Sequence, residues 1–289
     1  MNSTSRVAFL APAKLNISLE VFGKRPDGYH DIRSVMVPVS LYDEISVEET
    51  GEGIAIEVEG GSAPSDASNT CHKAARIFME RAGAPRGVRI SIRKRIPAEA
   101  GLGGGSSDAA ATLKGLLAVT GFAPPGELLL SMAAAVGADV PFFMCGRPAL
   151  VEGLGERVTP LSWPVPFCAL IVKPAFGLST REGYEKLRRE PGVPPRRGAV
   201  PDFRSWDDLV SAVGNDFERA WADDRPEIGE IRRDLLAAGA AAAGMTGSGS
   251  AIYGLYRDEE TAREAQGALS RNAGLHPGNG RRTFVARNI

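Results

Sequence analysis

The chain has 289 residues, of which 43% are hydrophobic and 24% are charged, and its formal net charge is −1 at pH 7. This length favours two domains or one large one, and the near-neutral charge argues against a protein that coats nucleic acid or an acidic membrane. No stretch approaches the roughly 20 apolar residues of a membrane span, and the N-terminal apolar run is too short for a signal peptide. The cysteines Cys71, Cys145 and Cys168 form no CxxC pair, which indicates neither a disulfide framework nor a zinc site. We therefore expect a cytoplasmic protein.

The first part of the chain has the alternating pattern of an antiparallel β region. Its first strand is expected to break at Pro12-Ala13-Lys14, and a later strand pair is expected to bend at Tyr42-Asp43. Between them, Arg25-Pro26-Asp27-Gly28 is a strong turn signal. A helix is predicted over residues 69–82, with Gly83 as its stop. The predicted strands cover residues 7–10, 15–22, 35–41, 44–49, 54–58 and 88–92.

A glycine-rich segment, residues 96–113, leads directly into a helix predicted to reach Thr120. Its glycines reach positive φ without strain and let a ligand touch the backbone. Ser106, Ser107 and Asp108 supply N-cap and first-turn residues. Backbone N–H groups at such a helix start suit an anion such as phosphate. The segment is neither a Walker A loop nor a convincing dinucleotide fingerprint, and a plain surface turn is the alternative interpretation.

The second half of the chain contains an isolated acidic residue and then an α+β pattern. Asp139 stands in an apolar segment after a predicted helix over 125–136, and is either a cap or a functional carboxylate. From Phe167 onward the order β, helices, β, α, β predicts helices packed on an antiparallel sheet. A second small-residue loop is Gly247-Ser248-Gly249, and residues 192–202 are predicted to be an exposed Pro/Arg-rich loop. The predicted elements are strands 167–172, 251–256 and 283–286 and helices 180–189, 206–213, 227–238 and 258–269.

Several separate motifs together resemble the GHMP small-molecule kinases. The matching stretches are PAKLN at 12–16, DGYH at 27–30, the loop at 97–107, GADVP at 137–141 and MTGSGS at 245–250. The resemblance covers essentially the whole chain. PAKLN and DGYH are similar to the branch that acts on a cytidine diphosphate-linked methylerythritol in the non-mevalonate (MEP pathway) isoprenoid route.

This resemblance implies an α+β, two-domain GHMP kinase fold. Residues 1–158 would form an N-terminal ATP-binding domain like ribosomal protein S5 domain 2, and residues 159–289 a ferredoxin-like C-terminal domain. It implies transfer of the γ-phosphoryl group of ATP to the 2-hydroxyl of that small-molecule substrate. The alternatives are a kinase for another alcohol, such as mevalonate or homoserine, and a non-catalytic nucleotide-binding regulator. No nucleic acid or membrane partner is expected, and the chain would be a monomer or weak homodimer.

The resemblance also implies roles for individual residues. Asp139 would be the catalytic carboxylate, and Lys14 would hold it ionised and steady the reacting hydroxyl. Mg²⁺ is expected because triphosphate charge needs compensation, although no protein ligand is assigned to it. Lys14 and Lys94 could each instead be a solvated strand end, and Tyr29 and His30 ordinary packing residues. ATP would be held by Pro97, Ala98, Glu99, Ala100, Gly101, Leu102, Gly103, Gly104, Gly105, Ser106 and Ser107, with Lys94 nearby; the substrate would be held by Asn16, Tyr29, His30, Gly247, Ser248 and Gly249.

Overall fold

The structure is a computed structural model that describes residues 6–83, 87–190, 200–271 and 280–289. These residues form two compact units, and each unit is discontinuous along the chain. The first unit contains residues up to 13 together with 42–98 and 103–146; the second contains 14–41, 99–102 and 147–289. The strands β1 (Arg6–Lys24) and β2 (His30–Thr50) each contribute residues to both units. The expected division of the family's two domains near residue 158 stays a prediction.

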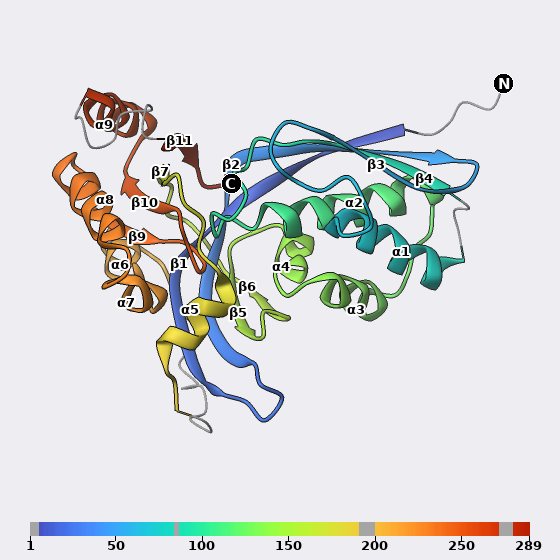
Figure 1. Ribbon diagram of the computed structural model, residues 1–289, viewed down its shortest axis with the longest axis horizontal. Coiled ribbons are helices and arrows are strands. Elements are labelled where there is room, and N and C mark those ends of the chain that lie inside the picture. The colour runs from blue at the N-terminus through green and yellow to red at the C-terminus, as the bar shows by residue number, and fades with distance from the viewer. Residues whose placement is uncertain (1–5, 84–86, 191–199, 272–279) are drawn as a thin grey trace. The chain divides into compact units, whose positions relative to one another are not determined.

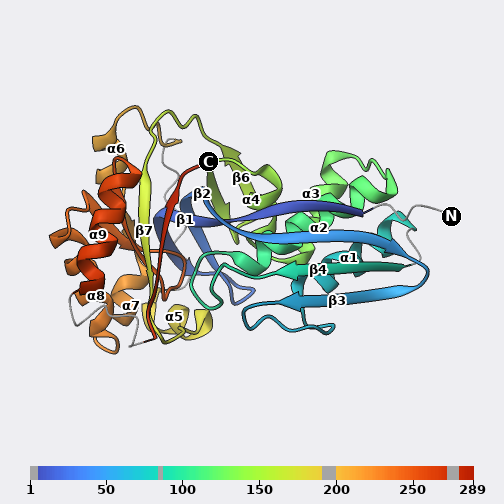
Figure 2. The ribbon, with the colours of Figure 1, turned by 90° about the horizontal axis from the view of Figure 1, so that it is seen from above.

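The first unit is a sheet with helices on one of its faces (Figures 1 and 2). Its strand order is β3-β4-β2-β1; β3 runs parallel to β4, and β4 runs antiparallel to β2. The core lies between the two layers, where Val47, Ile90, Phe78 and Leu113 are fully buried. The remaining elements of this unit are β3 (Gly53–Glu59), β4 (Gly87–Arg93), α1 (Thr70–Ala82), α2 (Gly104–Thr120), α3 (Gly126–Val136) and α4 (Val140–Cys145).

Local signals predicted the ends of α1 correctly but misplaced the start of α2. The side chain of Asn69 caps α1 by accepting from the N–H of Cys71, and Gly83 ends it in the left-handed conformation. The N-cap of α2 is Gly103, at φ +73°, whose carbonyl accepts from the N–H of Ser107 at 2.9 Å. The predicted capping role of the serines is therefore wrong, because a glycine at positive φ already turns the chain into the helix.

Two predicted breaks are also wrong, because β1 continues through Pro12 and β2 continues through Asp43. Proline has a φ that an extended strand accommodates and loses only one N–H donor. Asp43 is fully buried inside β2, where its carboxylate accepts from the N–H groups of Arg95 and Ile96. Its side chain therefore holds a neighbouring segment and does not mark a turn. The turn between the strands is confirmed, with Gly28 at φ +87°.

The second unit contains a four-stranded antiparallel sheet in the order β11-β7-β10-β9. In chain order this is 4-1-3-2, with α8 between the first and second strands and α9 between the third and fourth, which confirms the expected ferredoxin-like arrangement. Leu170 of β7, Ile231 and Leu235 of α8 and Leu19 of β1 belong to the core of this unit. The elements are β7 (Cys168–Lys173), β9 (Ala242–Met245), β10 (Ile252–Tyr256), β11 (Arg282–Arg287), α5 (Thr180–Leu187), α6 (Trp206–Ser211), α7 (Phe217–Trp221), α8 (Pro226–Ala237) and α9 (Glu259–Arg271).

Short elements were missing from the expectations. They are α4, α7, β9, β5 (Ala149–Gly153), β6 (Arg157–Pro160) and β8 (Gly214–Asn215). In the second unit β5 pairs with β2, and β8 pairs with β1 in parallel. Residues 192–199 of the expected exposed loop lie outside the described residues. Within the described part, no helix is both long and apolar enough to cross a membrane.

Candidate active site

Residues 97–107 are called the glycine loop below. Its residues 99–102 belong to the second unit and are held there by hydrogen bonds to their backbone carbonyls. Four successive carbonyl oxygens, from Glu99 to Leu102, each accept a hydrogen bond from a residue of this unit. Among the described contacts, the N–H groups of Ala100, Gly101 and Leu102 donate no hydrogen bond. The carbonyl oxygens of the loop therefore bond the protein, whereas these three N–H groups point to no acceptor among the described residues and can bind an anion. The donors to the four carbonyls are, in order, Ser250 N (3.3 Å), Ala251 N (3.1 Å), Thr246 Oγ1 (3.2 Å) and Lys14 N (3.0 Å).

Glycine is required within this fastened stretch. Gly101 has φ +72°, and a Cβ built there would lie 2.0 Å from the carbonyl oxygen of Thr246. Glu99, which is not glycine, also adopts a positive φ of 51°, a conformation that side chains other than glycine rarely take. The backbone of the loop is thus set by close packing.

Lys14 and Asn16 lie side by side on β1 in a buried polar network. Lys14 is 2% exposed and Asn16 is 1% exposed, so the alternative of a solvated strand end is wrong for Lys14. The Lys14 ammonium donates to Asn16 Oδ1, which also accepts from Gly247 N at 2.7 Å and from Thr246 Oγ1 at 3.1 Å. Asn16 Nδ2 donates to Ser34 Oγ at 2.7 Å. One neutral amide therefore joins the lysine to the C-terminal glycine loop.

That loop, Gly247-Ser248-Gly249, connects β9 to β10. A Cβ on Gly247, which has φ +56°, would lie 3.2 Å from Lys14 Nζ and 2.9 Å from the Cα of Gly101. Ser248 Oγ shares a hydrogen bond of 2.7 Å with Thr180 Oγ1. The structure thus brings Lys14, Asn16, residues 99–102 and Gly247 together within the second unit.

Tyr29 and His30 follow the turn between β1 and β2. The Tyr29 side chain is exposed, whereas the His30 ring stacks on Tyr184 of α5, with ring centroids 5.2 Å apart and planes inclined by 13°. His30 Nδ1 lies 2.9 Å from the carbonyl oxygen of Phe22, which makes Nδ1 the donor and leaves Nε2 for another group. Sequence reasoning missed Tyr184, because an aromatic residue in an amphipathic helix normally indicates packing.

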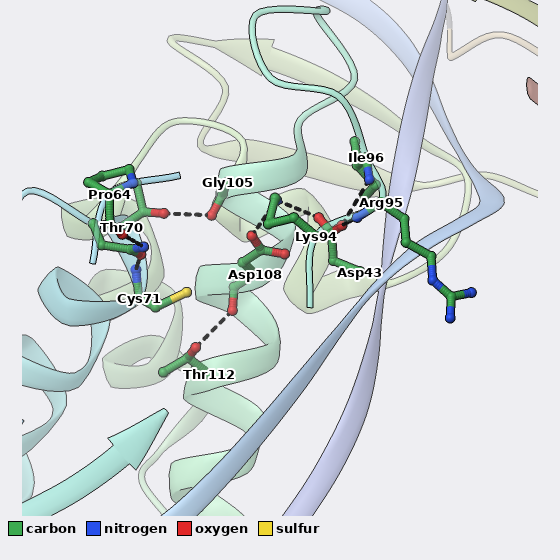
Figure 3. Close-up of polar contacts among 11 residues, drawn as sticks. Asp43, Pro64, Thr70, Cys71, Lys94, Arg95, Ile96, Gly105, Asp108 and Thr112 are labelled. Carbon is green, nitrogen blue, oxygen red and sulfur yellow. Dashed lines mark hydrogen bonds and ion pairs between the residues drawn. The ribbon is translucent and has the colours of Figure 1, made fainter. Parts of the chain in front are cut away.

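Lys94, in the first unit, lies at the centre of a buried ionic cluster with Asp43 and Asp108 (Figure 3). Its ammonium is 2.5 Å from Asp43 Oδ2 and 2.6 Å from Asp108 Oδ2. Burial lowers the pKa of Lys94, but the two carboxylates outweigh it and raise that pKa above its usual value. Burial raises the pKa of Asp108, and Lys94 opposes this rise. The alternative of a solvated strand end is therefore wrong for Lys94 as well.

Two buried oxygen atoms near the start of α2 fit a phosphate or its metal ion. Ser107 Oγ and Asp108 Oδ1 are buried, and neither has a hydrogen-bond partner among the described residues. A buried polar atom without a partner is unfavourable unless a ligand or water satisfies it. No group of three or more His, Cys, Asp or Glu residues in the described part could hold a metal.

Asp139 occupies the N-cap position of α4 in the first unit. Its side chain is half-buried and makes no capping hydrogen bond, and its backbone has φ −83° and ψ −10°. The capping alternative that the sequence left open is therefore not realised. The carboxylate keeps its acceptor capacity for a ligand.

Comparisons with known proteins identify the family of the chain. The family model for the GHMP kinases N terminal domain matches residues 69–147, and that for the GHMP kinases C terminal matches residues 203–274. The chain is 39% identical over 274 residues to 4-diphosphocytidyl-2-C-methyl-D-erythritol kinase of Geobacter sp. (strain M21), covering 93% of this chain and 96% of the relative.

Solved structures give the same picture. A crystal structure of 4-(cytidine 5'-diphospho)-2C-methyl-D-erythritol kinase is 35% identical, with a TM-score of 0.80 over 98% of this chain and 99% of its own. Homoserine kinase from Cytophaga hutchinsonii is 20% identical, with a TM-score of 0.71 over 100% of this chain and 96% of its own, and shares the fold. The chain belongs to the GHMP kinase family, alongside its 4-diphosphocytidyl-2-C-methyl-D-erythritol kinase relatives.

Proposed function

We propose that the chain transfers the γ-phosphoryl group of ATP to the 2-hydroxyl of 4-diphosphocytidyl-2-C-methyl-D-erythritol, giving the 2-phosphate and ADP in the MEP pathway of isoprenoid biosynthesis. The observation that carries the proposal is the buried Lys14, held by Asn16 beside two glycine loops. A protein that only binds nucleotide has no need of a buried ammonium at this place. The names of the similar proteins supply the substrate.

Phosphoryl transfer requires the phosphates to be held, their charge to be compensated and the hydroxyl to be placed in line. The 2-hydroxyl oxygen forms the new bond to the γ-phosphorus as the bond to the β,γ-bridging oxygen breaks. In this proposal Asp139 accepts the hydroxyl proton, and Lys14 stabilises the oxygen as negative charge develops. Backbone N–H groups of the glycine loop, those of Ala100, Gly101 and Leu102 among them, bind the phosphates. Mg²⁺, near Ser106 or Ser107, would neutralise phosphate charge.

We assign recognition of the cytidine to the turn that carries Tyr29 and His30. The exposed Tyr29 ring offers a face for stacking, and the orientation of His30 leaves Nε2 to read a base edge. Stacking on Tyr184 holds the imidazole plane in place. Residues 247–249 line the substrate side through their backbone.

The proposal also covers the cellular location and the partners of the enzyme. Cys71, Cys145 and Cys168 are free thiols, which supports a reducing, cytoplasmic environment. The proposed partner is the small-molecule substrate alone, without nucleic acid or membrane, and the chain acts as a monomer or weak homodimer.

A substrate panel tests this function. Purified protein with ATP and Mg²⁺ is offered the cytidyl substrate, mevalonate and homoserine in parallel, and ADP release is measured. We expect turnover with the cytidyl substrate, with the new phosphate ester detected at the 2-position by phosphorus NMR. Turnover of another alcohol without the cytidine moiety would assign a different branch of the family, and ATP binding without any turnover would indicate a regulator.

A further inference from the structure

The ionic cluster of Asp43, Lys94 and Asp108 connects the two ends of the glycine loop. Lys94 lies just before the loop, at the end of β4, and Asp108 lies just after it, in α2. Asp43 belongs to β2. All three side chains belong to the first unit and are buried, with exposed fractions of 7% for Lys94, 4% for Asp108 and 0% for Asp43.

The Asp43 carboxylate holds the entrance to the loop with both oxygens. Oδ1 accepts from Arg95 N at 2.5 Å and from Ile96 N at 2.9 Å, and Oδ2 accepts from Lys94 Nζ at 2.5 Å (Figure 3). The same ammonium donates to Asp108 Oδ2 at 2.6 Å. A single cation thus bridges the strand that enters the loop and the helix that leaves it.

The chemistry of the cluster favours a role in positioning the glycine loop. Charge-assisted hydrogen bonds in a dry environment are short and directional, and loss of one partner leaves a buried charge uncompensated. A second contact supports the same region, since Thr70 Oγ1 donates to Gly105 O at 2.8 Å (Figure 3). By contrast, Arg89 on the same strand pairs with Glu48 and Glu57 at the surface, where ion pairs contribute little.

We propose that Asp43, Lys94 and Asp108 form an ionic clamp that fixes the spacing between the two ends of the glycine loop and thereby sets affinity for ATP. In the clamp the three act as positioning residues through the backbone of residues 97–107. Asp108 contributes its Oδ2 atom to the clamp, and its Oδ1 atom takes no part in it. Lys94 gives its ammonium to the two carboxylates. This inference rests on the proposed function of the loop as the ATP site.

The test compares clamp variants with a surface control. Asp43→Asn keeps an amide oxygen to accept from Arg95 N and Ile96 N but removes the ion pair, and Lys94→Met removes the cation. Arg89→Met makes the same change of charge on the same strand outside the clamp. Calorimetry with a non-hydrolysable ATP analogue measures nucleotide affinity, steady-state kinetics gives KM for each substrate, and thermal unfolding checks the fold.

We expect both clamp variants to weaken analogue binding and raise KM for ATP by about tenfold or more. KM for the alcohol should change less than about twofold, and Arg89→Met should match the wild type. Unchanged ATP affinity in a folded Asp43→Asn protein would overturn the proposal. So would equal rises of both KM values, a loss of kcat alone in Lys94→Met, or clamp variants that do not fold at all. Because the analogue needs no acceptor, a wild type that binds it but phosphorylates no cytidyl substrate would refute the proposed function and leave the clamp testable.

Discussion

The two halves of the glycine loop are held by different chemistry. Residues 99–102, in the second unit, are held by neutral hydrogen bonds, among them those from Thr246 Oγ1 and the backbone N–H of Lys14. The residues that flank the loop in the first unit are held differently, because the buried Lys94 ammonium lies between the carboxylates of Asp43 and Asp108. Neutral bonds contribute roughly 1 kcal/mol each and fail gradually, whereas a buried ionic cluster is costly to disrupt at any single member. We therefore expect the loss of one hydrogen bond to residues 99–102 to be less disruptive than the loss of one member of the ionic cluster.

The largest effect is expected at Asp139, which belongs to neither set of loop contacts. Asp139→Asn keeps the shape of the side chain but removes the proposed proton acceptor, so kcat should fall by roughly 10² or more while ATP binding stays near that of the wild type. Steady-state kinetics and analogue binding measure the two quantities. A near-normal kcat would remove Asp139 from proton transfer and leave the loop contacts as the main determinants of activity.

The support of residues 99–102 is tested at Asn16, whose side chain bonds both Thr246 and Lys14. Asn16→Leu removes the acceptor shared by Lys14 Nζ, Thr246 Oγ1 and Gly247 N and leaves buried donors without partners. The free energy of unfolding should fall by about 3 kcal/mol, and kcat should fall more than KM for ATP rises, because Lys14 loses its orientation.

Urea denaturation and initial rates measure these effects, and Asn16→Asp is the matched control because it keeps an acceptor for all three donors. If Asn16→Leu instead raised KM for ATP as strongly as Asp43→Asn, the two halves of the loop would not differ in function.

How much of this arrangement is readable from the sequence depends on the range of the interactions. Asn69 and Gly83 delimit α1 through contacts within a few residues, so their pattern predicted the helix correctly. Asp43 pairs with a lysine 51 positions away, and Asn16 with a threonine 230 positions away. Such partners are chosen by the tertiary fold, so a buried Asp43 was misread as a corner of the chain. The glycine loop was found because a run of glycines is a signal within one short stretch of sequence, whereas the residues that support the loop lie far away in the chain.

A smaller effect is expected for Tyr29→Ala, on KM for the cytidyl substrate. Its ring is 64% exposed, so Tyr29→Ala should leave stability nearly unchanged and raise KM for the cytidyl substrate several-fold through loss of one stacking face. KM for ATP should stay close to the wild-type value, in contrast to the clamp variants. An equal rise of both KM values would move Tyr29 away from the nucleobase.

The smallest effect concerns pH and Glu218. Its Oε1 accepts from the N–H of Met245 at 3.0 Å, and Met245 directly precedes Thr246, which bonds Asn16. Burial raises the pKa of Glu218 above its usual 4.5, although the Met245 N–H and Arg232 oppose the rise. As pH rises from 4.5 through the raised value, the folded protein retains a proton that the unfolded chain has released, so this carboxyl makes the free energy of unfolding fall over that window. Glu218→Gln keeps the amide oxygen for Met245 but does not titrate. Urea denaturation at a series of pH values measures the free energy of unfolding of both proteins. The value for the variant should rise relative to that of the wild type through this window, and the difference should then stay constant. A difference that does not vary with pH would show that Glu218 is not desolvated by the fold.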